Sequence, residues 1–299
     1  MRPDSPSPAI PFLIACAGIA TYSAMDVLMK GLSIDIGAYN AVLWRTGAGT
    51  FLAGAFYLAS RPKWPGRATL RIHAWRSLFV AGMALCFFWA LARLPIAEAI
   101  ALAFVAPLMA LYMAAIFLGE KIGPRSIAAS LLGLAGVVVI VAGKLGGDYD
   151  EEALWAVGAV FLSATFYAYN LILARRQAKM AEPMEIAFFQ NFFVAAILAL
   201  GAPWFLAVPA ATQAPNIMGA ALLATTSLLL LSWAYARAET QILATTEYTG
   251  FLWAMLFGWY FYGEPVTLPT LAGALLIVAA CLIVARKVPH EDPIEPAAA

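Results

Sequence analysis

The sequence predicts an all-α integral membrane protein in which ten transmembrane helices form two inverted five-helix repeats around a central cavity. Composition is the first observation: 63% of the 299 residues are hydrophobic and 12% are charged, whereas about a quarter of a soluble domain is charged. The second is that apolar stretches of membrane length recur along the whole chain. The third is that motifs of the first half return 144 residues later.

Each expected span has about 20 mostly apolar residues, enough to cross a hydrocarbon layer of ~30 Å. The gaps between spans are too short for a soluble catalytic or nucleic-acid-binding domain. The polar, proline-rich ends of the chain are expected to be disordered. The spans are expected at 10–30, 36–59, 74–93, 95–118, 125–143, 153–174, 185–207, 217–236, 240–262 and 267–285.

Basic residues indicate the orientation of these spans. With the N-terminus inside, 14 of the 18 Lys and Arg residues fall on the cytoplasmic side, three fall on the opposite side, and Arg45 lies within a span. Cytoplasmic loops of membrane proteins carry such an excess of cations. We therefore expect a multi-pass protein of the bacterial inner membrane with both termini in the cytoplasm.

The repeat is visible in short motifs. "WALAR" at 89–93 returns as "WAYAR" at 233–237, "ATYSAMDVL" at 20–28 as "ATFYAYNLI" at 164–172, and "FLGE" at 117–120 as "FYGE" at 261–264. The predicted organisation is a disordered tail at 1–9, a first repeat at 10–143, a periplasmic linker at 144–152, a second repeat at 153–286 and a cytoplasmic tail at 287–299.

Five spans per repeat is an odd number, so the second copy enters the membrane from the side opposite to the first. Inverted repeats of this kind are a recurring architecture of secondary transporters, because one interface then allows two near-equivalent packings that open to opposite sides. A duplicated membrane scaffold without transport activity is the alternative.

The pattern "WALARLPIAEAIALAFVAPLMALYMAAIFLGEKIG" at 89–123, followed by a span rich in Gly and Ala, resembles the EamA-type unit of the drug/metabolite transporter superfamily. The second copy departs from the pattern, since Gln190 stands near the position equivalent to Arg45 and Phe251 at the position equivalent to Pro107. The markers of the resemblance are Arg45, Pro107, Gly119–Glu120 and Gly263–Glu264.

This resemblance implies a ten-helix exporter of small metabolites, in a group that includes amino-acid exporters, nucleotide-sugar carriers and multidrug pumps. Amino acids with aromatic or hydrophobic side chains are the leading cargo, because the interior is rich in aromatic residues and has few fixed charges. A multidrug or lipophilic-cation exporter is the alternative, and an intramembrane enzyme is a third reading.

Candidate substrate contacts are aromatic, amide and charged residues inside the spans, where a polar group needs a partner or a wet cavity. Arg45 and Glu247 are expected about 10–14 Å deep, where they either form a structural ion pair or bind the two charges of a zwitterion. Asp26, Lys30 and Glu98 are expected nearer the outer surface, paired or in contact with water. The predicted site comprises Tyr22, Arg45, Trp89, Glu98, Tyr167, Asn170, Gln190, Trp233, Glu247 and Tyr248.

Small residues three or four apart predict close helix contacts rather than ligand sites. The fifth span carries Gly133 and Gly136, and the tenth carries Gly273 and Ala274. We expect these residues to pack the scaffold.

No enzyme activity, cofactor or metal is expected. The chain has no Gly-rich phosphate loop ending in Gly-Lys-Ser/Thr, and its two histidines are far apart in the sequence. The expected partners are a small-molecule substrate and membrane lipid, without nucleic acid, and the expected working form is a monomer.

The predicted orientation can be tested by single-cysteine labelling. In a thiol-free background, Gly146→Cys should react with a membrane-impermeant reagent in intact cells, because Gly146 lies in the predicted periplasmic linker. Gly66→Cys should not react, because it lies in a predicted cytoplasmic loop. Labelling of Gly66→Cys alone would reverse the orientation.

Overall fold

The part of the chain that the computed structural model describes is mostly helical and contains no strand. It comprises residues 9–60, 64–118, 124–145, 151–177, 180–235, 237, 246–247 and 249–285. Residues 1–8 of the predicted N-terminal tail, the predicted C-terminal tail, most of the predicted linker, Gly119–Glu120 and Tyr248 lie outside these residues, whereas Ala9 is the first residue of α1. The α-helices are α1 (Ala9–Ala59), α2 (Arg67–Leu91), α3 (Ile96–Ala103), α4 (Ala106–Leu118), α5 (Pro124–Leu145), α6 (Glu151–Gln177), α7 (Pro183–Ala199), α8 (Ala202–Phe205), α9 (Ala214–Tyr235), α11 (Thr249–Tyr262) and α12 (Leu268–Ala285).

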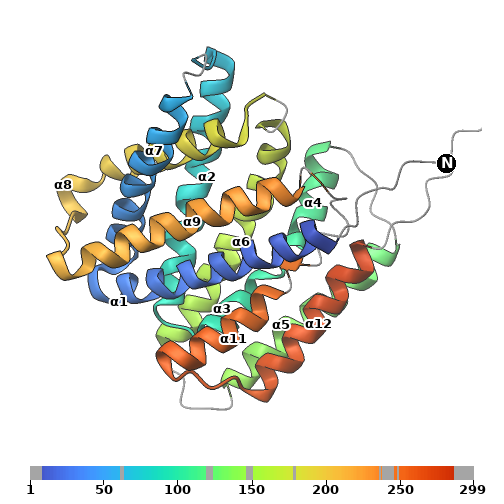
Figure 1. Ribbon diagram of the computed structural model, residues 1–299. Coiled ribbons are helices and arrows are strands. Elements are labelled where there is room, and N and C mark those ends of the chain that lie inside the picture. The colour runs from blue at the N-terminus through green and yellow to red at the C-terminus, as the bar shows by residue number, and fades with distance from the viewer. Residues whose placement is uncertain are drawn as a thin grey trace, which may run out of the picture.

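Helix α1 contains two span-length segments joined at Gly37. It has 51 residues, more than twice the ~20 that cross a bilayer. Gly37 has non-helical dihedral angles, φ 79° and ψ 150°, in a region that glycine adopts without a Cβ clash. Helix α1 changes direction along its length (Figure 1). Gly37 lies just inside the second predicted span, 36–59, and not in the gap predicted between the first two spans.

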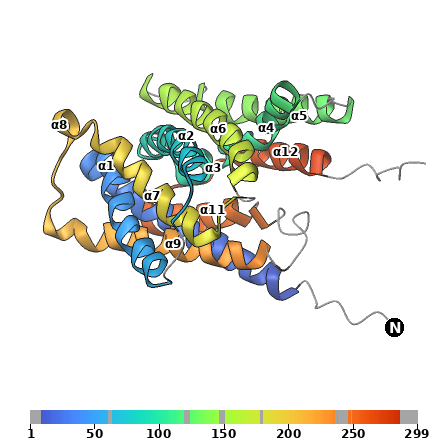
Figure 2. The same cartoon turned by 90° about the horizontal axis from the view of Figure 1, so that it is seen from above.

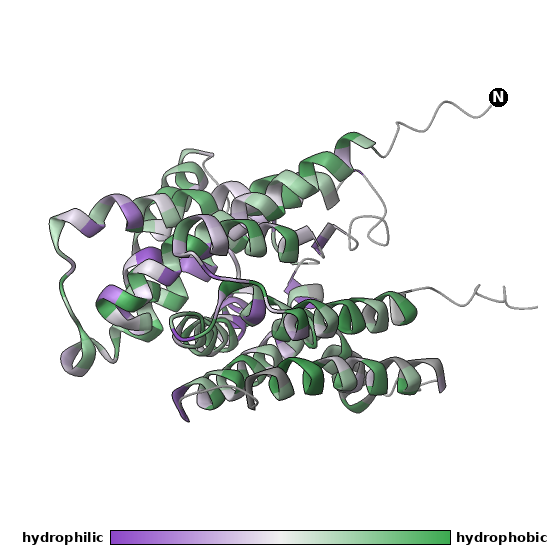
Figure 3. Cartoon of the chain, turned by 90° about the horizontal axis from the view of Figure 1, so that it is seen from below, coloured by the Kyte–Doolittle hydropathy of each residue, from purple (hydrophilic) through white to green (hydrophobic). Residues whose placement is uncertain are grey.

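Several helices are apolar enough for a membrane. In the described part, four are also long enough to cross one, namely Ala9–Ala59, Arg67–Leu91, Glu151–Ala174 and Ala211–Ala234. Shorter apolar helices lie at Ile96–Ala110, Ser130–Ala142, Pro183–Ala199 and Leu268–Ala280. Hydrophobic residues predominate along the helices in Figure 3, which confirms the prediction of an all-α chain with apolar helices.

Prolines set several helix boundaries. Pro183 and Pro124 are the first residues of α7 and α5, where the missing amide hydrogen costs nothing. The predicted fourth span is interrupted, because α3 ends at Ala103 and α4 begins at Ala106. Pro107 is the second residue of α4, and its nitrogen cannot donate the hydrogen bond that would continue α3 into α4.

The helices pack mainly across the two halves of the sequence. The first part of α1 lies along α9, α2 lies against α6, α5 against α12, and α3 against α11. Figures 1 and 2 show α5 and α12 side by side at one edge of the bundle, with α1 and α9 together in another part of it.

Glycines allow the close contact between α5 and α12. A Cβ added to Gly136 would lie 2.6 Å from the carbonyl oxygen of Gly273 and 2.8 Å from Cγ1 of Ile277. Both distances are shorter than side-chain contacts allow, so the two backbones meet where side chains are absent. The expectation that these small residues pack the scaffold is confirmed.

Gly136→Ala should therefore destabilise the protein by about 1–3 kcal/mol, because the new methyl group would overlap backbone atoms that cannot move independently. Thermal unfolding of purified protein in detergent would measure the change. Gly158→Ala is the matched control, since a Cβ at this exposed position in α6 meets nothing within 4 Å. Equal unfolding midpoints for the two variants would show that α5 and α12 do not meet at Gly136.

Candidate functional site

A buried ion pair joins three segments that are far apart in the sequence. Lys30 near the end of the first part of α1 pairs with Glu264, and their side chains are 6% and 15% exposed. Lys30 Nζ also donates to the carbonyl oxygen of Leu94 at 2.6 Å, and Glu264 Oε2 accepts from the amide of Ile96 at 2.7 Å. The Lys30–Glu264 cluster thereby links α1 to the α2–α3 and α11–α12 connections.

The Gly-Glu motif explains how Glu264 reaches this cluster. Gly263 has φ +64°, a left-handed conformation that ends helices and favours glycine. Its amide donates to the carbonyl oxygen of Trp259 at 2.9 Å, and the amide of Glu264 donates to that of Gly258 at 3.1 Å. The chain therefore reverses at once, and the carboxylate of Glu264 points back into the bundle.

The structure corrects the expectation for the acidic residues near Lys30. Asp26 and Glu98 are buried, at 2% and 4% exposed, and are not wetted at a surface. Lys30 pairs with Glu264 and not with Asp26. Glu98 lies close enough to Lys30 to interact with it electrostatically.

A second polar cluster surrounds His73, which is fully buried in α2. Arg76 donates to the side-chain oxygens of Asn170, at 2.7 Å, and Gln177. The amide nitrogen of Gln177 lies 2.5 Å from His73 Nδ1, and His73 Nε2 lies 3.0 Å from Glu185 Oε1. All of these bonds fit when Gln177 donates to Nδ1 and Nε2 donates to the carboxylate. The His73 cluster therefore fastens α2 to α6 and α7.

Two predicted site residues belong to this cluster. Asn170 is bonded to Arg76, and Tyr167 lies near enough to Arg76 to interact with it. Arg76 was not among the site residues predicted from the sequence. Its spacing of three residues from His73 on the same helix was the available signal that the two side chains share a face.

A third group of polar residues lies in α1. Asp26, Tyr22 and Arg45 are near enough to interact electrostatically. Oδ1 of Asp26 and Nε of Arg45 are buried and have no hydrogen-bond partner. No nitrogen of Arg45 lies within 4.0 Å of a carboxylate oxygen of Asp26.

The repeated Trp-Ala-x-Ala-Arg motif closes a helix in each half. The guanidinium of Arg93 lies 3.9 Å from the centre of the Trp89 ring, and that of Arg237 lies 4.1 Å from the centre of the Trp233 ring. Each arginine also donates to the carbonyl oxygen of its own tryptophan, at 3.1 and 3.2 Å. In each half, the repeated motif therefore forms a cation–π contact between its arginine and its tryptophan. The same arginine also donates a hydrogen bond to a carbonyl oxygen at the helix end.

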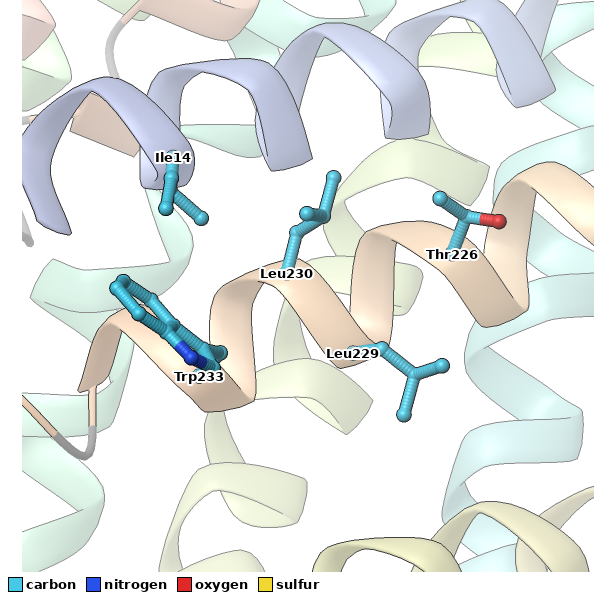
Figure 4. A pocket seen from close by; sticks show the side chains of 5 residues that line it. All are labelled: Ile14, Thr226, Leu229, Leu230 and Trp233. Atoms are coloured by element: carbon cyan, nitrogen blue, oxygen red, sulfur yellow. The ribbon is translucent and has the colours of Figure 1, made fainter. Parts of the chain in front are cut away.

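An apolar groove of about 400 Å³ lies between the beginning of α1 and the end of α9. Four of its residues come from one face of α9, at the spacing of successive turns (Figure 4). Trp233, 37% exposed, is the predicted site residue among them. The groove is lined by Ile14, Thr226, Leu229, Leu230 and Trp233.

The remaining predicted contacts are not gathered in one place. Gln190 is half-buried in α7, and Glu247 is exposed in a short turn before α11. Tyr248 lies outside the described residues. The structure thus groups Tyr22 with Arg45, Tyr167 with Asn170, and Glu98 with the Lys30–Glu264 cluster.

Comparison with known proteins decides the family. The sequence matches the EamA-like transporter family twice, over residues 9–142 and 154–286. The chain belongs to the EamA-like transporter family. It is a multi-pass membrane transporter.

Individual relatives of this EamA-like transporter have various cargoes in their names. The Pseudopaline exporter CntI of Pseudomonas aeruginosa is 31% identical over 92% of this chain and 95% of its own. The Riboflavin transporter of Rhizobium johnstonii is 28% identical over 91% and 89%. The Aromatic amino acid exporter YddG of Ancylobacter novellus is 28% identical over 58% and 56%. A solved structure with 21% identity covers 92% of the chain at a TM-score of 0.60, which supports the fold alone.

The Lys30–Glu264 pair should contribute to stability. Lys30→Met and Glu264→Gln should each lower the free energy of unfolding by about 3–5 kcal/mol, because each leaves a buried charge without its partner. The double variant should lose less than the sum of the two. Thermal unfolding in detergent would measure all three, and strictly additive losses would show that the two charges do not interact.

Proposed function

We propose that this protein exports small metabolites from bacterial cells by alternating access between two inverted five-helix repeats. Amino acids with aromatic or hydrophobic side chains are the leading cargo. The proposal rests on one observation above all, which is that contacts between the halves recur when the halves are exchanged.

The first example of this exchange is a pair of buried serines. Ser163 in α6 donates to the carbonyl oxygen of Met83 in α2 at 2.9 Å. The 144-residue offset carries position 83 to 227 and position 163 back to 19. At these places Ser227 in α9 donates to the carbonyl oxygen of Gly18 in α1 at 2.8 Å. This contact lies one residue from the expected position, and the donor and acceptor helices are interchanged. The α2–α6 and α1–α9 interfaces thus have nearly the same register.

The α5–α12 interface coincides with itself when the two halves of the chain are exchanged by the 144-residue offset. A Cβ at Gly133 would lie 3.6 Å from Cβ of Ala280. Exchange of the halves carries these two positions to Ile277 and Gly136, and those residues are also in contact. Such self-matching is what a two-fold axis through this crossing requires, and it supports ten spans arranged as inverted repeats.

The two polar clusters lie near opposite ends of α2. The Lys30–Glu264 cluster contacts Leu94 just beyond its C-terminal end, and the His73 cluster lies near its N-terminal end. At 1.5 Å per residue the two are about 30 Å apart, roughly the thickness of the hydrocarbon layer. In the proposed orientation, the Lys30–Glu264 cluster holds the outer ends of the helices together and the His73 cluster holds the inner ends together. Alternating access would open these two clusters one at a time.

The cargo is inferred from the charges and from the names of the relatives. Buried ionisable groups within the spans are few, and they include both signs, as a zwitterion would require. Two of the compared relatives are named exporters, and one of these is named for aromatic amino acids. These features favour amino-acid export over transport of lipophilic cations, which would have no use for Arg45.

Uptake of labelled phenylalanine into liposomes that contain the purified protein tests this proposal. Wild-type protein should exchange phenylalanine, and Arg45→Ala should reduce exchange about tenfold or more, because a half-buried charge contact is lost. Glu247→Gln should reduce it less, because Glu247 is exposed. Arg71→Ala, which removes an exposed arginine in α2, is the control.

The outcomes separate the candidate cargoes. Transport of a lipophilic cation without exchange of any amino acid would overturn amino-acid export. If phenylalanine exchange is unchanged in Arg45→Ala, Arg45 does not bind the cargo and has a structural role. Chemical conversion of a solute by the purified protein would favour an intramembrane enzyme.

A further inference from the structure

We infer that Asp26 and Arg45 form the binding site for the ammonium and carboxylate groups of an α-amino acid. This assignment rests on the proposed amino-acid transport and gives it a specific site. It replaces Glu247 with Asp26 as the anionic contact, because Glu247 is exposed in a short turn while Asp26 is 2% exposed.

The first argument is burial without a partner. Oδ1 of Asp26 and Nε of Arg45 are shielded from solvent and accept or donate no hydrogen bond. Met25 and Met29, which lie near Asp26 on α1, are apolar and at most 1% exposed. Charged groups in such surroundings are costly unless paired, so a site with two of them is suited to a ligand that supplies the missing partners.

The second argument is the gap between the charges. Opposite charges in an apolar medium attract most strongly at contact, and a structural ion pair would have closed to a direct bond, as Lys30 and Glu264 have. Asp26 and Arg45 interact electrostatically but stay more than 4.0 Å apart. An α-amino acid carries an ammonium and a carboxylate on the same carbon, and can therefore bridge two opposite charges separated in this way.

The neighbours of the site supply access and control. Tyr22 lies one turn before Asp26 on the same face of α1 and is 44% exposed, so its ring can contact an apolar side chain of the cargo. Lys30 lies one turn after Asp26 and is held by Glu264. The Tyr262 hydroxyl donates to the carbonyl oxygen of Val27 at 2.7 Å. The Lys30–Glu264 cluster thus closes the site at the proposed outer end.

Competition by analogues that lack one charge tests the assignment. Exchange of labelled phenylalanine into liposomes is measured against unlabelled phenylalanine, 3-phenylpropanoate, which lacks the ammonium, and phenethylamine, which lacks the carboxylate. In wild-type protein each analogue should compete at least about tenfold more weakly than phenylalanine, equivalent to about 1.4 kcal/mol.

The variants should lose one preference each. In Asp26→Asn, 3-phenylpropanoate should compete within about threefold of phenylalanine, while phenethylamine stays weak. In Arg45→Gln the pattern should be reversed. Asp35→Asn and Arg71→Gln remove exposed charges from α1 and α2, and should keep both wild-type preferences.

The ratios are compared within each variant, so a lower amount of folded protein does not change them. Wild-type protein that exchanges phenylalanine but accepts both analogues equally would overturn the assignment, as would variants that keep both preferences. If one variant does not fold, the other still gives a reading for its own charge. Wild-type protein that exchanges no amino acid would instead overturn the proposed function.

Discussion

The structure depends on one constraint, which is that a polar group inside a membrane must find its partner within the protein. Helices satisfy the backbone, and the helix ends are where special sequence features are needed. Arg93 and Arg237 bond the carbonyl oxygens of Trp89 and Trp233, and Gly263 turns the chain so that Glu264 can bond the amide of Ile96. The short motifs of this chain are therefore solutions to the same hydrogen-bonding problem.

The same constraint explains why the polar side chains form clusters. The Lys30–Glu264 cluster and the His73 cluster each join segments from both halves of the sequence, and their members bond one another inside the protein. Such networks hold specific helix ends together. The Asp26 and Arg45 pair departs from this rule, because each side chain has a buried atom without a partner, and departures of this kind are expected at functional sites.

The two halves share packing and differ in chemistry. Their small-residue contacts match under the proposed exchange, as at Gly133–Ala280 and Gly136–Ile277. The charged residues do not: the position equivalent to Asp26 is Asn170, which bonds Arg76, and the position equivalent to Lys30 is Ala174. The duplicated scaffold therefore keeps similar packing in its two halves, while the buried charges stand at positions that the repeat does not share.

The sequence by itself determined the helical membrane class, the family and the small-residue contacts, because hydropathy, the 144-residue echo and the spacing of glycines are local or periodic features of the chain. The sequence also singled out Arg45, because a charged residue within an apolar span is visible from the local hydropathy. Only the tertiary structure decided that Lys30 binds Glu264, that Arg76 binds Asn170, and that Asp26 lies beside Arg45 without touching it. Those facts depend on which distant helices meet and at what register, and the pairing of buried charges follows from that packing.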